Sequence, residues 1–281
     1  LMQKAILHPL EQYLRSDRLP HTWCPGCGIG TVMQAFIKAV DELKIDPKKM
    51  ATISGIGCTG RIPLYLKFDG AHVLHGRAIP VALGIKLARP DLKVVVFGGD
   101  GDIVSIGGNH LIHAARRNAD ITVIMVNNFI YGLTGGQVAP TTPKETFTYT
   151  SPYNPDSKPF NVIQLVAAAG ATYVARWSTA YPVLLKESIK KALLHRGFSF
   201  IEVISQCPEI FGRLNGFKTP YDLLKKIKDV GVIRRNIGPF EAKYDWNSEI
   251  TLGEFVSKDE PTYLDQLNQI IEKAKVQGDK K

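Results

Sequence analysis

Polar residues that could bind a hard cation follow two apolar runs of the chain. Gly99-Asp100-Gly101 comes after KVVVFG, and Asn127-Asn128 comes after ITVIMV. Ligands of open α/β sheets bind at the carboxyl ends of strands, and Mg²⁺ prefers oxygen ligands and usually keeps a substrate phosphate in its shell. The glycines allow the backbone to approach a diphosphate closely, and a helix that begins near Ser105 would direct its N–H groups at that anion. The pattern predicts a site for Mg²⁺ and a diphosphate; the alternative is an ordinary strand-end turn.

The four cysteines form a second candidate site. Cys24 and Cys27 lie in a C-x-x-C turn before a helix, whereas Cys58 and Cys207 each follow a predicted strand. In a chain of this size without a secretory signal, metal or redox use is favoured over disulfides. Four thiolates from three segments could hold structural Zn²⁺ or a [4Fe–4S] cluster. Only one pair is close in sequence, and Cys207 precedes a proline, which favours the cluster; four unrelated buried thiols are the third alternative.

Short apolar runs predict the elements that must position these residues. VVVFG and ITVIMV have no polar alternation, which suits parallel strands that are covered on both faces. Helical spacing recurs between the runs, for example at Met33, Phe36, Ile37 and Val40. The fold class is therefore α/β, with a doubly wound, mostly parallel sheet. Strands are predicted over 51–54, 94–98, 121–126, 171–174 and 200–204, and further helices over 79–88, 105–118 and 179–195.

Two segments do not follow this alternation. Residues 129–160 are rich in Gly, Thr, Pro, Tyr and Ser, and so long a loop is either functional or a mistaken assignment. Residues 208–260 are predicted to be irregular, because Pro and Gly are scattered through them. We divide the chain into an α/β domain with both candidate sites over 1–237, and a C-terminal arm and helix over 238–281 that docks on this domain or on a partner. The helix has apolar residues at Tyr263, Leu264, Leu267, Ile270 and Ile271.

The composition is that of an ordinary globular protein. Of the 281 residues, 44% are hydrophobic and 22% are charged, which excludes collagen, coiled coil and wholesale disorder. No apolar run approaches the ~20 residues of a membrane helix, and the first residues lack a signal-peptide core, so we expect a cytoplasmic protein that does not bind membranes. The net charge of +9 is not concentrated in basic runs interleaved with aromatic residues, which argues against nucleic-acid binding.

Several stretches carry a family resemblance. The GDG…NN pair resembles the thiamine diphosphate motif. Together with longer stretches it resembles the β subunit of 2-oxoacid:ferredoxin oxidoreductases, in unbroken order over residues 18–237. These stretches are WCPGCG, GIGCTG, HGRAIPVALGIKLARP, IYGLTGGQVAPTT and SQCPEIFGR. The resemblance implies the thiamine diphosphate-binding fold, in the form of its diphosphate-binding module.

The resemblance also implies which residues hold the cofactors. One [4Fe–4S] cluster would lie on Cys24, Cys27, Cys58 and Cys207. Mg²⁺ would be bound by Asp100, Asn128 and the backbone carbonyl of Ile130. Thiamine diphosphate would contact the loop around Cys58, the histidine of LHGRA, the residues after Asp100 and the loop after Asn128. The implied cofactor-binding residues are Ile56, Gly57, Cys58, Thr59, His75, Gly101, Asp102, Gly132, Leu133 and Thr134.

The activity implied by the resemblance is the oxidative decarboxylation of a 2-oxo acid, 2-oxoglutarate or pyruvate, to acyl-CoA and CO₂. Coenzyme A is the co-substrate, and electrons leave through the cluster to ferredoxin. No motif here supplies the glutamate that activates thiamine diphosphate. In the family it comes from the α subunit, so we expect activity only in an αβ or (αβ)₂ assembly. Gly135 occupies a position where some relatives have a basic residue, and LTGGQVAPTT with CPEIFGR looks closer to 2-oxoglutarate-type subunits.

Two other functions are compatible with parts of the pattern. A non-redox thiamine diphosphate decarboxylase or carboligase subunit would share GDG…NN but would not need four cluster cysteines. A zinc-stabilised, non-catalytic assembly subunit would use the cysteines but would not bind thiamine diphosphate. The colour of the anaerobically purified chain separates the zinc alternative from the main interpretation, because iron–sulfur proteins are brown.

Overall fold

An eight-stranded sheet forms the centre of the computed structural model, which describes residues 9–153 and 157–278. The strand order is β2-β1-β3-β4-β8-β7-β10-β9, and neighbouring strands are parallel except for the antiparallel β10 and β7. The strands are β1 Met50–Ser54, β2 Asp69–His72, β3 Lys93–Gly99, β4 Thr122–Asn127, β7 Tyr173–Ser178, β8 Ser199–Ile204, β9 Gly231–Ile233 and β10 Ile250–Ser257. Two short antiparallel strands, β5 Ile130–Tyr131 and β6 Gln137–Val138, form a separate hairpin.

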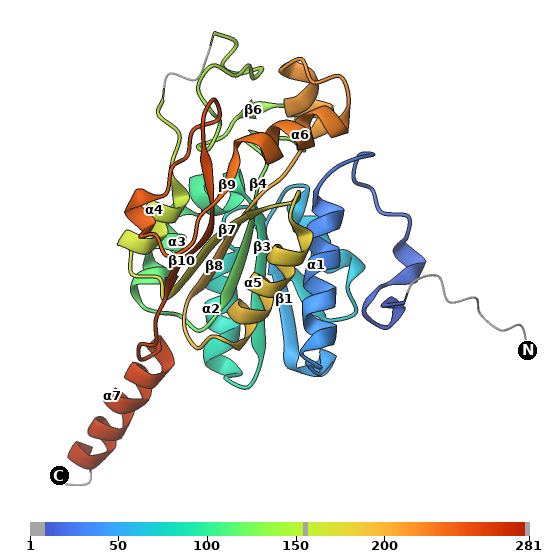
Figure 1. Cartoon of the computed structure of the whole chain (residues 1–281). Coiled ribbons are helices and arrows are strands. Elements are labelled where there is room, and N and C mark those ends of the chain that lie inside the picture. The colour runs from blue at the N-terminus through green and yellow to red at the C-terminus, as the bar shows by residue number, and fades with distance from the viewer. Residues whose placement is uncertain (1–8, 154–156, 279–281) are drawn as a thin grey trace, which may run out of the picture.

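Helices cover both faces of the sheet (Figure 1). The α-helices are α1 Ile29–Glu42, α2 Ala78–Ala88, α3 Gly108–Arg116, α4 Val162–Ala168, α5 Pro182–Leu194, α6 Pro220–Val230 and α7 Tyr263–Gly278. Shorter 3-10 turns span Glu11–Tyr13, Ser16–Arg18, Pro47–Lys49, Thr59–Tyr65 and Pro239–Glu241, and π-helical turns span Gly101–Ile106 and Pro208–Gly212. α1 and α5 pack on one face, and α2, α3 and α4 pack on the other.

Successive strand residues alternate between the two hydrophobic cores. In β3, Val95 and Phe97 belong to the core under α1 and α5, while Val94 and Val96 belong to the opposite core. This alternation follows from the two-residue period of a strand, and both sets are apolar because both faces are covered. The predicted α/β class and the doubly wound, mostly parallel sheet are confirmed.

The predicted elements agree with the structure in the first two thirds of the chain. Four of the five predicted strands match β1, β3, β4 and β8 within about a residue or two, whereas the run at 171–174 forms β7 only from Tyr173. The helix predicted over 105–118 is divided into a π-helical turn and α3. The long loop at 129–160 contains only the β5–β6 hairpin among its described residues.

The prediction that residues 208–260 are irregular was wrong. They contain α6, whose Leu223, Ile227 and Val230 are buried at helical spacing, and β10, which pairs with β7. α6 begins with a capping box: the Thr219 hydroxyl accepts from the backbone N–H of Asp222, and the Asp222 carboxylate accepts from that of Thr219.

The proposed division of the chain at residue 237 stays a prediction, with β10 in the same sheet as the preceding strands. α7 leaves this sheet and projects away from it (Figure 1). Its first turn is anchored, because Asp265 accepts hydrogen bonds from Thr262 and from Arg196. Ile270, Ile271 and Val276 are exposed. No helix in the described part of the chain is long and apolar enough to cross a membrane.

We expect Glu249→Gln to destabilise the fold by weakening the contact between the segment after β9 and the segment before β10. Glu249 accepts two hydrogen bonds from the Arg234 guanidinium, at 2.8 and 2.9 Å, and this contact lowers the pKa of Glu249 to about 2. A carboxyl group whose pKa is lowered by folding stabilises the fold above its unfolded pKa, and the effect is lost as pH falls. Wild type should therefore exceed the variant by about 1 kcal/mol at pH 7, and the difference should shrink as pH falls from about 4.5 towards 2.

Urea unfolding at several pH values between 3 and 7 measures this difference. Glu260→Gln is the control, because its ion pair with Lys258 is exposed on both sides and should contribute little. A difference between wild type and Glu249→Gln that grows as pH falls would contradict the prediction.

Candidate functional site

The carboxyl ends of β3 and β4 bring Asp100 close to Asn127-Asn128. The strands are adjacent, with Gly99 opposite Val126. Asp100 is 2% exposed, and its carboxylate accepts hydrogen bonds from Gly101 N at 3.0 Å and from Thr141 Oγ at 2.5 Å. Burial raises the pKa of Asp100 to about 7, although both hydrogen bonds lower it. In the described chain this carboxylate has no cationic side chain beside it, so a bound cation would supply the missing charge.

The two asparagines have different surroundings. Asn127 is fully buried: its Nδ2 donates to Glu202 Oε1 at 2.7 Å and to the Tyr244 hydroxyl at 3.0 Å, and its Oδ1 accepts from Phe129 N. The half-buried Asn128 side chain makes no hydrogen bond within the described residues. Asn127 is therefore held by the protein, whereas the amide of Asn128 is available to a ligand, as its predicted role in binding Mg²⁺ requires.

Asp102 accepts hydrogen bonds from two loops, one at Ile56 and the other at Gly76. Its Oδ1 accepts from Gly76 N at 2.7 Å and from Ile56 N at 3.3 Å, and it also contacts His75 Nδ1. The other oxygen, Oδ2, is buried and has no hydrogen-bond partner among the residues that the structure describes. The glycine at 55 is required by this close approach, because a Cβ there would lie 2.3 Å from both carboxylate oxygens. The side chain of Asp102 thus faces the predicted cofactor loops, and its predicted contact with thiamine diphosphate stays a prediction.

The loop after Asn128 closes over Gly101. The Tyr131 hydroxyl donates to the carbonyl of Gly101 at 3.2 Å, and a Cβ on Gly101 would lie 2.2 Å from the Tyr131 ring. Ile130, whose carbonyl is the third predicted Mg²⁺ ligand, is buried in β5. Beyond it, Gly132 is half-buried, while Leu133 and Thr134 are exposed.

The second predicted contact loop has a similar mixture of burial and open space. Thr59 is buried at the start of a 3-10 turn, whereas Ile56 is exposed and Gly57 is half-buried. A Cβ on Gly57 would meet nothing within 4 Å, so there is free space beside this backbone. The structure therefore places this loop beside Asp102, with part of it accessible.

Hydrogen bonds join the three cysteine-bearing segments. The Trp23 indole donates to the carbonyl of Cys58 at 2.8 Å, and Gly28 N donates to the carbonyl of Gln206 at 3.3 Å. Within the C-x-x-C turn, Cys27 N donates to the carbonyl of Cys24 at 3.0 Å. The C-x-x-C turn and the segment that carries Cys207 are more than a hundred positions apart in the sequence, and these hydrogen bonds hold them beside each other.

The thiols are close enough to affect one another electrostatically. Burial raises the pKa of Cys27 to about 12, and the other three cysteines add smaller increases. Burial also raises the pKa of Cys58 and of Cys207. Among the described residues, no three His, Cys, Asp or Glu side chains are arranged as the ligands of a single metal ion. The cysteines thus lie in one neighbourhood.

The cysteine group borders the Asp100 site. A Cβ on Gly132 would lie 3.5 Å from Cys207 Sγ and 3.8 Å from Asn128 Nδ2. Asp100 also contributes to the raised pKa of Cys207. The two candidate sites therefore share the carboxyl edge of the sheet.

A buried polar network beneath this edge was missed by the sequence analysis. Arg176 and Glu202 are fully buried and form an ion pair, with Nε and Oε2 2.6 Å apart. Glu202 reaches Asn127, which is also held by Tyr244. The available signal was a charged residue in each of the otherwise apolar runs YVARWS and SFIEVI, since a charge is rarely buried without a partner.

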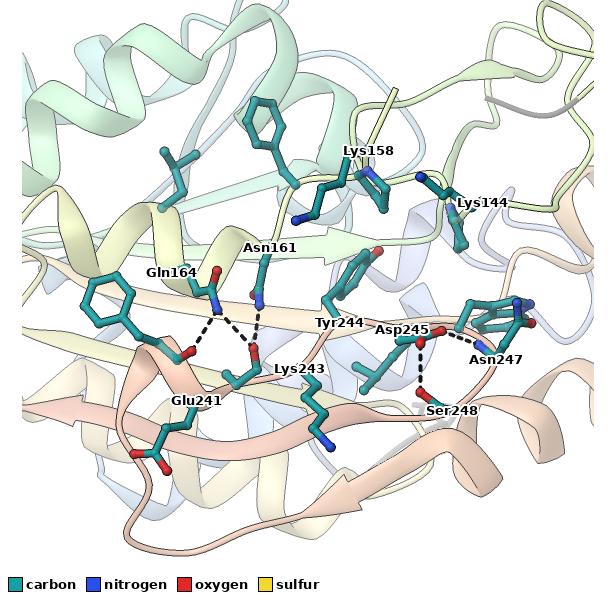
Figure 2. A pocket seen from close by; sticks show the side chains of 18 of the residues that line it. Lys144, Lys158, Asn161, Gln164, Glu241, Lys243, Tyr244, Asp245, Asn247 and Ser248 are labelled. Atoms are coloured by element: carbon teal, nitrogen blue, oxygen red, sulfur yellow. Dashed lines mark hydrogen bonds between the residues drawn. The ribbon is translucent and has the colours of Figure 1, made fainter. Parts of the chain in front are cut away.

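An open pocket of about 1090 Å³ lies beside this network, between α4 and the segment Phe240–Ser248 (Figure 2). Tyr244 forms part of its wall. None of the residues predicted to bind a cofactor or metal lines this pocket, so it is separate from the predicted chemistry.

Comparisons with known proteins agree with this arrangement. A family model described as "Thiamine pyrophosphate enzyme, C-terminal TPP binding domain" matches residues 54–203. The chain is 49% identical to 2-oxoglutarate synthase subunit KorB of Methanocaldococcus jannaschii, over 96% of this chain and 99% of that protein. It is 47% identical to subunit beta of 2-oxoacid:ferredoxin oxidoreductase 2 of Aeropyrum pernix, over 66% of this chain and 60% of that protein.

A solved structure extends the agreement to three dimensions. The 2-oxoglutarate:ferredoxin oxidoreductase of Magnetococcus marinus was solved with 2-oxoglutarate, coenzyme A and succinyl-CoA bound. Its matching chain has a TM-score of 0.84 and 36% identity, and the match covers 97% of this chain and 92% of that one. With its thiamine pyrophosphate-binding domain, the chain belongs to the family of β subunits of 2-oxoacid:ferredoxin oxidoreductases.

Proposed function

We propose that this chain binds the diphosphate end of thiamine diphosphate through Mg²⁺, and a [4Fe–4S] cluster beside it. The observation that carries the proposal is the position of Gly132 between Asn128 and Cys207. An electron that leaves the cofactor would have only a short distance to travel to the cysteine group. A carboligase subunit without a redox step would not need this adjacency.

The residues around Asp100 fit the cation. Mg²⁺ takes oxygen ligands in octahedral geometry, and the Asp100 carboxylate, the free amide of Asn128 and the carbonyl of Ile130 are the proposed donors. The open backbone at Gly57 and the loop from Gly132 to Thr134 border the space proposed for the cofactor. Leu133 is exposed and would pack against the cofactor from this loop.

The cysteine group offers the four thiolate ligands that a [4Fe–4S] cluster takes. The four thiols lie close enough to interact electrostatically. The raised pKa values of Cys27, Cys58 and Cys207 mean that protons must leave these thiols when they bind iron.

Thiamine diphosphate, when bound, supplies the electron sink for decarboxylation of a 2-oxo acid. This chain's residues would bind and orient it: Asp100 and Asn128 through the cation, and the loops held by Asp102 from the other side. The M. marinus enzyme was solved with 2-oxoglutarate and coenzyme A, and we propose the same substrate class here. Gly135 cannot supply a basic contact to a distal substrate carboxylate, so that contact must come from elsewhere.

We further propose two protein partners. The first is an α subunit that contributes the activating glutamate, because no residue of the motifs described above supplies it. The second is ferredoxin as the electron acceptor. The net charge of +9 favours association with an acidic carrier.

Metal analysis of the anaerobically purified chain tests the proposal. About four iron and four sulfide per chain, with broad absorption near 400 nm, are expected for one [4Fe–4S] cluster. One zinc without iron would contradict the redox function and favour the zinc-stabilised assembly subunit. The complex with the α subunit should bind thiamine diphosphate only when Mg²⁺ is present; binding that is unaffected by chelation would contradict the cation site.

A further inference from the structure

Tyr244 lies in the segment between the 3-10 turn Pro239–Glu241 and β10, for which the sequence indicated no role beyond docking. Its hydroxyl donates to the carbonyl of Thr141 at 2.7 Å and accepts from Asn127 Nδ2 at 3.0 Å. Of these two partners, Thr141 contacts the proposed Mg²⁺ ligand Asp100, and Asn127 directly precedes the proposed ligand Asn128. We propose that Tyr244 is a positioning residue for this site, an inference that rests on the proposed function and concerns a residue without direct contact to the cation.

The first contact acts on the carboxylate ligand. Thr141 is fully buried, and its hydroxyl donates to Asp100 Oδ2 at 2.5 Å. Tyr244 holds the backbone of the same threonine by its carbonyl. The direction of the Asp100 carboxylate is therefore fixed through a residue that Tyr244 anchors.

The second contact acts on the turn that carries Asn128. Tyr244 and Glu202 together accept both N–H groups of the Asn127 amide, which leaves Asn127 Oδ1 turned towards Phe129 N, at 3.2 Å. Phe129 has a positive φ of 69°, which is uncommon for a residue other than glycine. Contacts from the surrounding structure must hold this conformation. Because Asn128 stands between Asn127 and Phe129, the turn sets where its amide points.

The hydroxyl can be removed without removing the ring. The Tyr244 ring lies over the Arg176 guanidinium, 5.2 Å from Cζ to the ring centroid, and borders the open pocket (Figure 2). Arg176 is itself fixed by Glu202 and by the Asn161 side chain. In Tyr244→Phe the ring keeps these neighbours, so the variant deletes the two hydrogen bonds and little else.

The experiment is an Mg²⁺ titration of thiamine diphosphate binding to the complex with the α subunit, measured by calorimetry for wild type and Tyr244→Phe. Two hydrogen bonds to buried partners are lost, so the Mg²⁺ concentration at half-saturation should rise roughly tenfold. At saturating Mg²⁺ the affinity for thiamine diphosphate should return to near the wild-type value.

Tyr173→Phe is the matched control. Tyr173 is another buried tyrosine, and its hydroxyl bonds Ser188 between β7 and α5, away from the carboxyl edge. It should lose comparable thermal stability and keep the wild-type Mg²⁺ dependence. A wild-type titration curve for Tyr244→Phe, or an equal displacement in Tyr173→Phe, would overturn the positioning role. Absence of thiamine diphosphate binding in the wild-type complex would instead reject the proposed function.

Discussion

A Cys24→Ser variant, purified anaerobically, should lose the intact [4Fe–4S] cluster and, with it, electron transfer to ferredoxin. Iron should fall from about four to three or fewer per chain, because one of four thiolate ligands is missing and the cluster is lost or converted. Cys24 is the most suitable of the four for this test, since it is exposed while the other three are partly buried. Its substitution should therefore disturb packing least.

Iron and sulfide analysis, the visible spectrum and ferredoxin reduction measure this outcome. Ser205→Ala is the control. It removes a buried hydroxyl, two residues from Cys207, that has no hydrogen-bond partner in the described part of the chain, and it keeps all four thiols. It should keep the cluster. Far-UV circular dichroism shows whether Cys24→Ser is folded, because cluster binding is coupled to folding. A folded variant with four iron atoms and wild-type electron transfer would disprove the assignment of Cys24 as a ligand.

The parts of the fold that the sequence predicted are those with a strong local pattern. β3 and β4 are buried on both faces over most of their length, so each contains an unbroken apolar run that is visible without knowledge of its neighbours. β2 has the sequence DGAH and lies at the edge of the sheet. Because it is mostly exposed, it has no apolar run that would identify it as a strand. The apolar run of β10 is interrupted by Gly253 and Glu254, and α6 follows a segment that contains glycine and proline. For these reasons the strand and the helix were not recognised from the spacing of their apolar residues.

The candidate site shows a similar division. The proximity of Asp100 to Asn127-Asn128 was predictable because each follows a recognisable buried strand, and parallel strands end at the same edge. The role proposed for Tyr244 was not predictable from the sequence. Its hydroxyl bonds Asn127, 117 positions away, and Thr141, 103 positions away, and contacts between such distant residues leave no local sequence pattern. The π-helical turn at Gly101–Ile106 was likewise hidden, since it depends on the anchoring of Asp102 to the loops at Ile56 and Gly76.

Asp100→Asn should weaken Mg²⁺-dependent binding of thiamine diphosphate by about 200-fold, or about 3 kcal/mol. The substitution keeps the size of the side chain but removes the charge that a cation would neutralise in a buried site. Calorimetry on the complex with the α subunit, at fixed Mg²⁺, measures the change. Asp120→Asn is the control: its carboxylate lies before β4, at the opposite edge of the sheet, where it pairs with Lys86.

Stability measurements distinguish loss of the cation from loss of the fold. Burial raises the pKa of Asp100 from 3.8 to about 7. Since the folded state then binds the proton more tightly than the unfolded state, this group lowers stability as pH rises from about 4 to 7, and the cost is complete above 7. Without Mg²⁺ at pH 8, Asp100→Asn should therefore unfold at the same or a higher temperature than wild type. With Mg²⁺ and thiamine diphosphate present, the order should reverse, because only the wild-type carboxylate binds the cation. Equal stabilisation of both proteins would show that Asp100 is not a ligand.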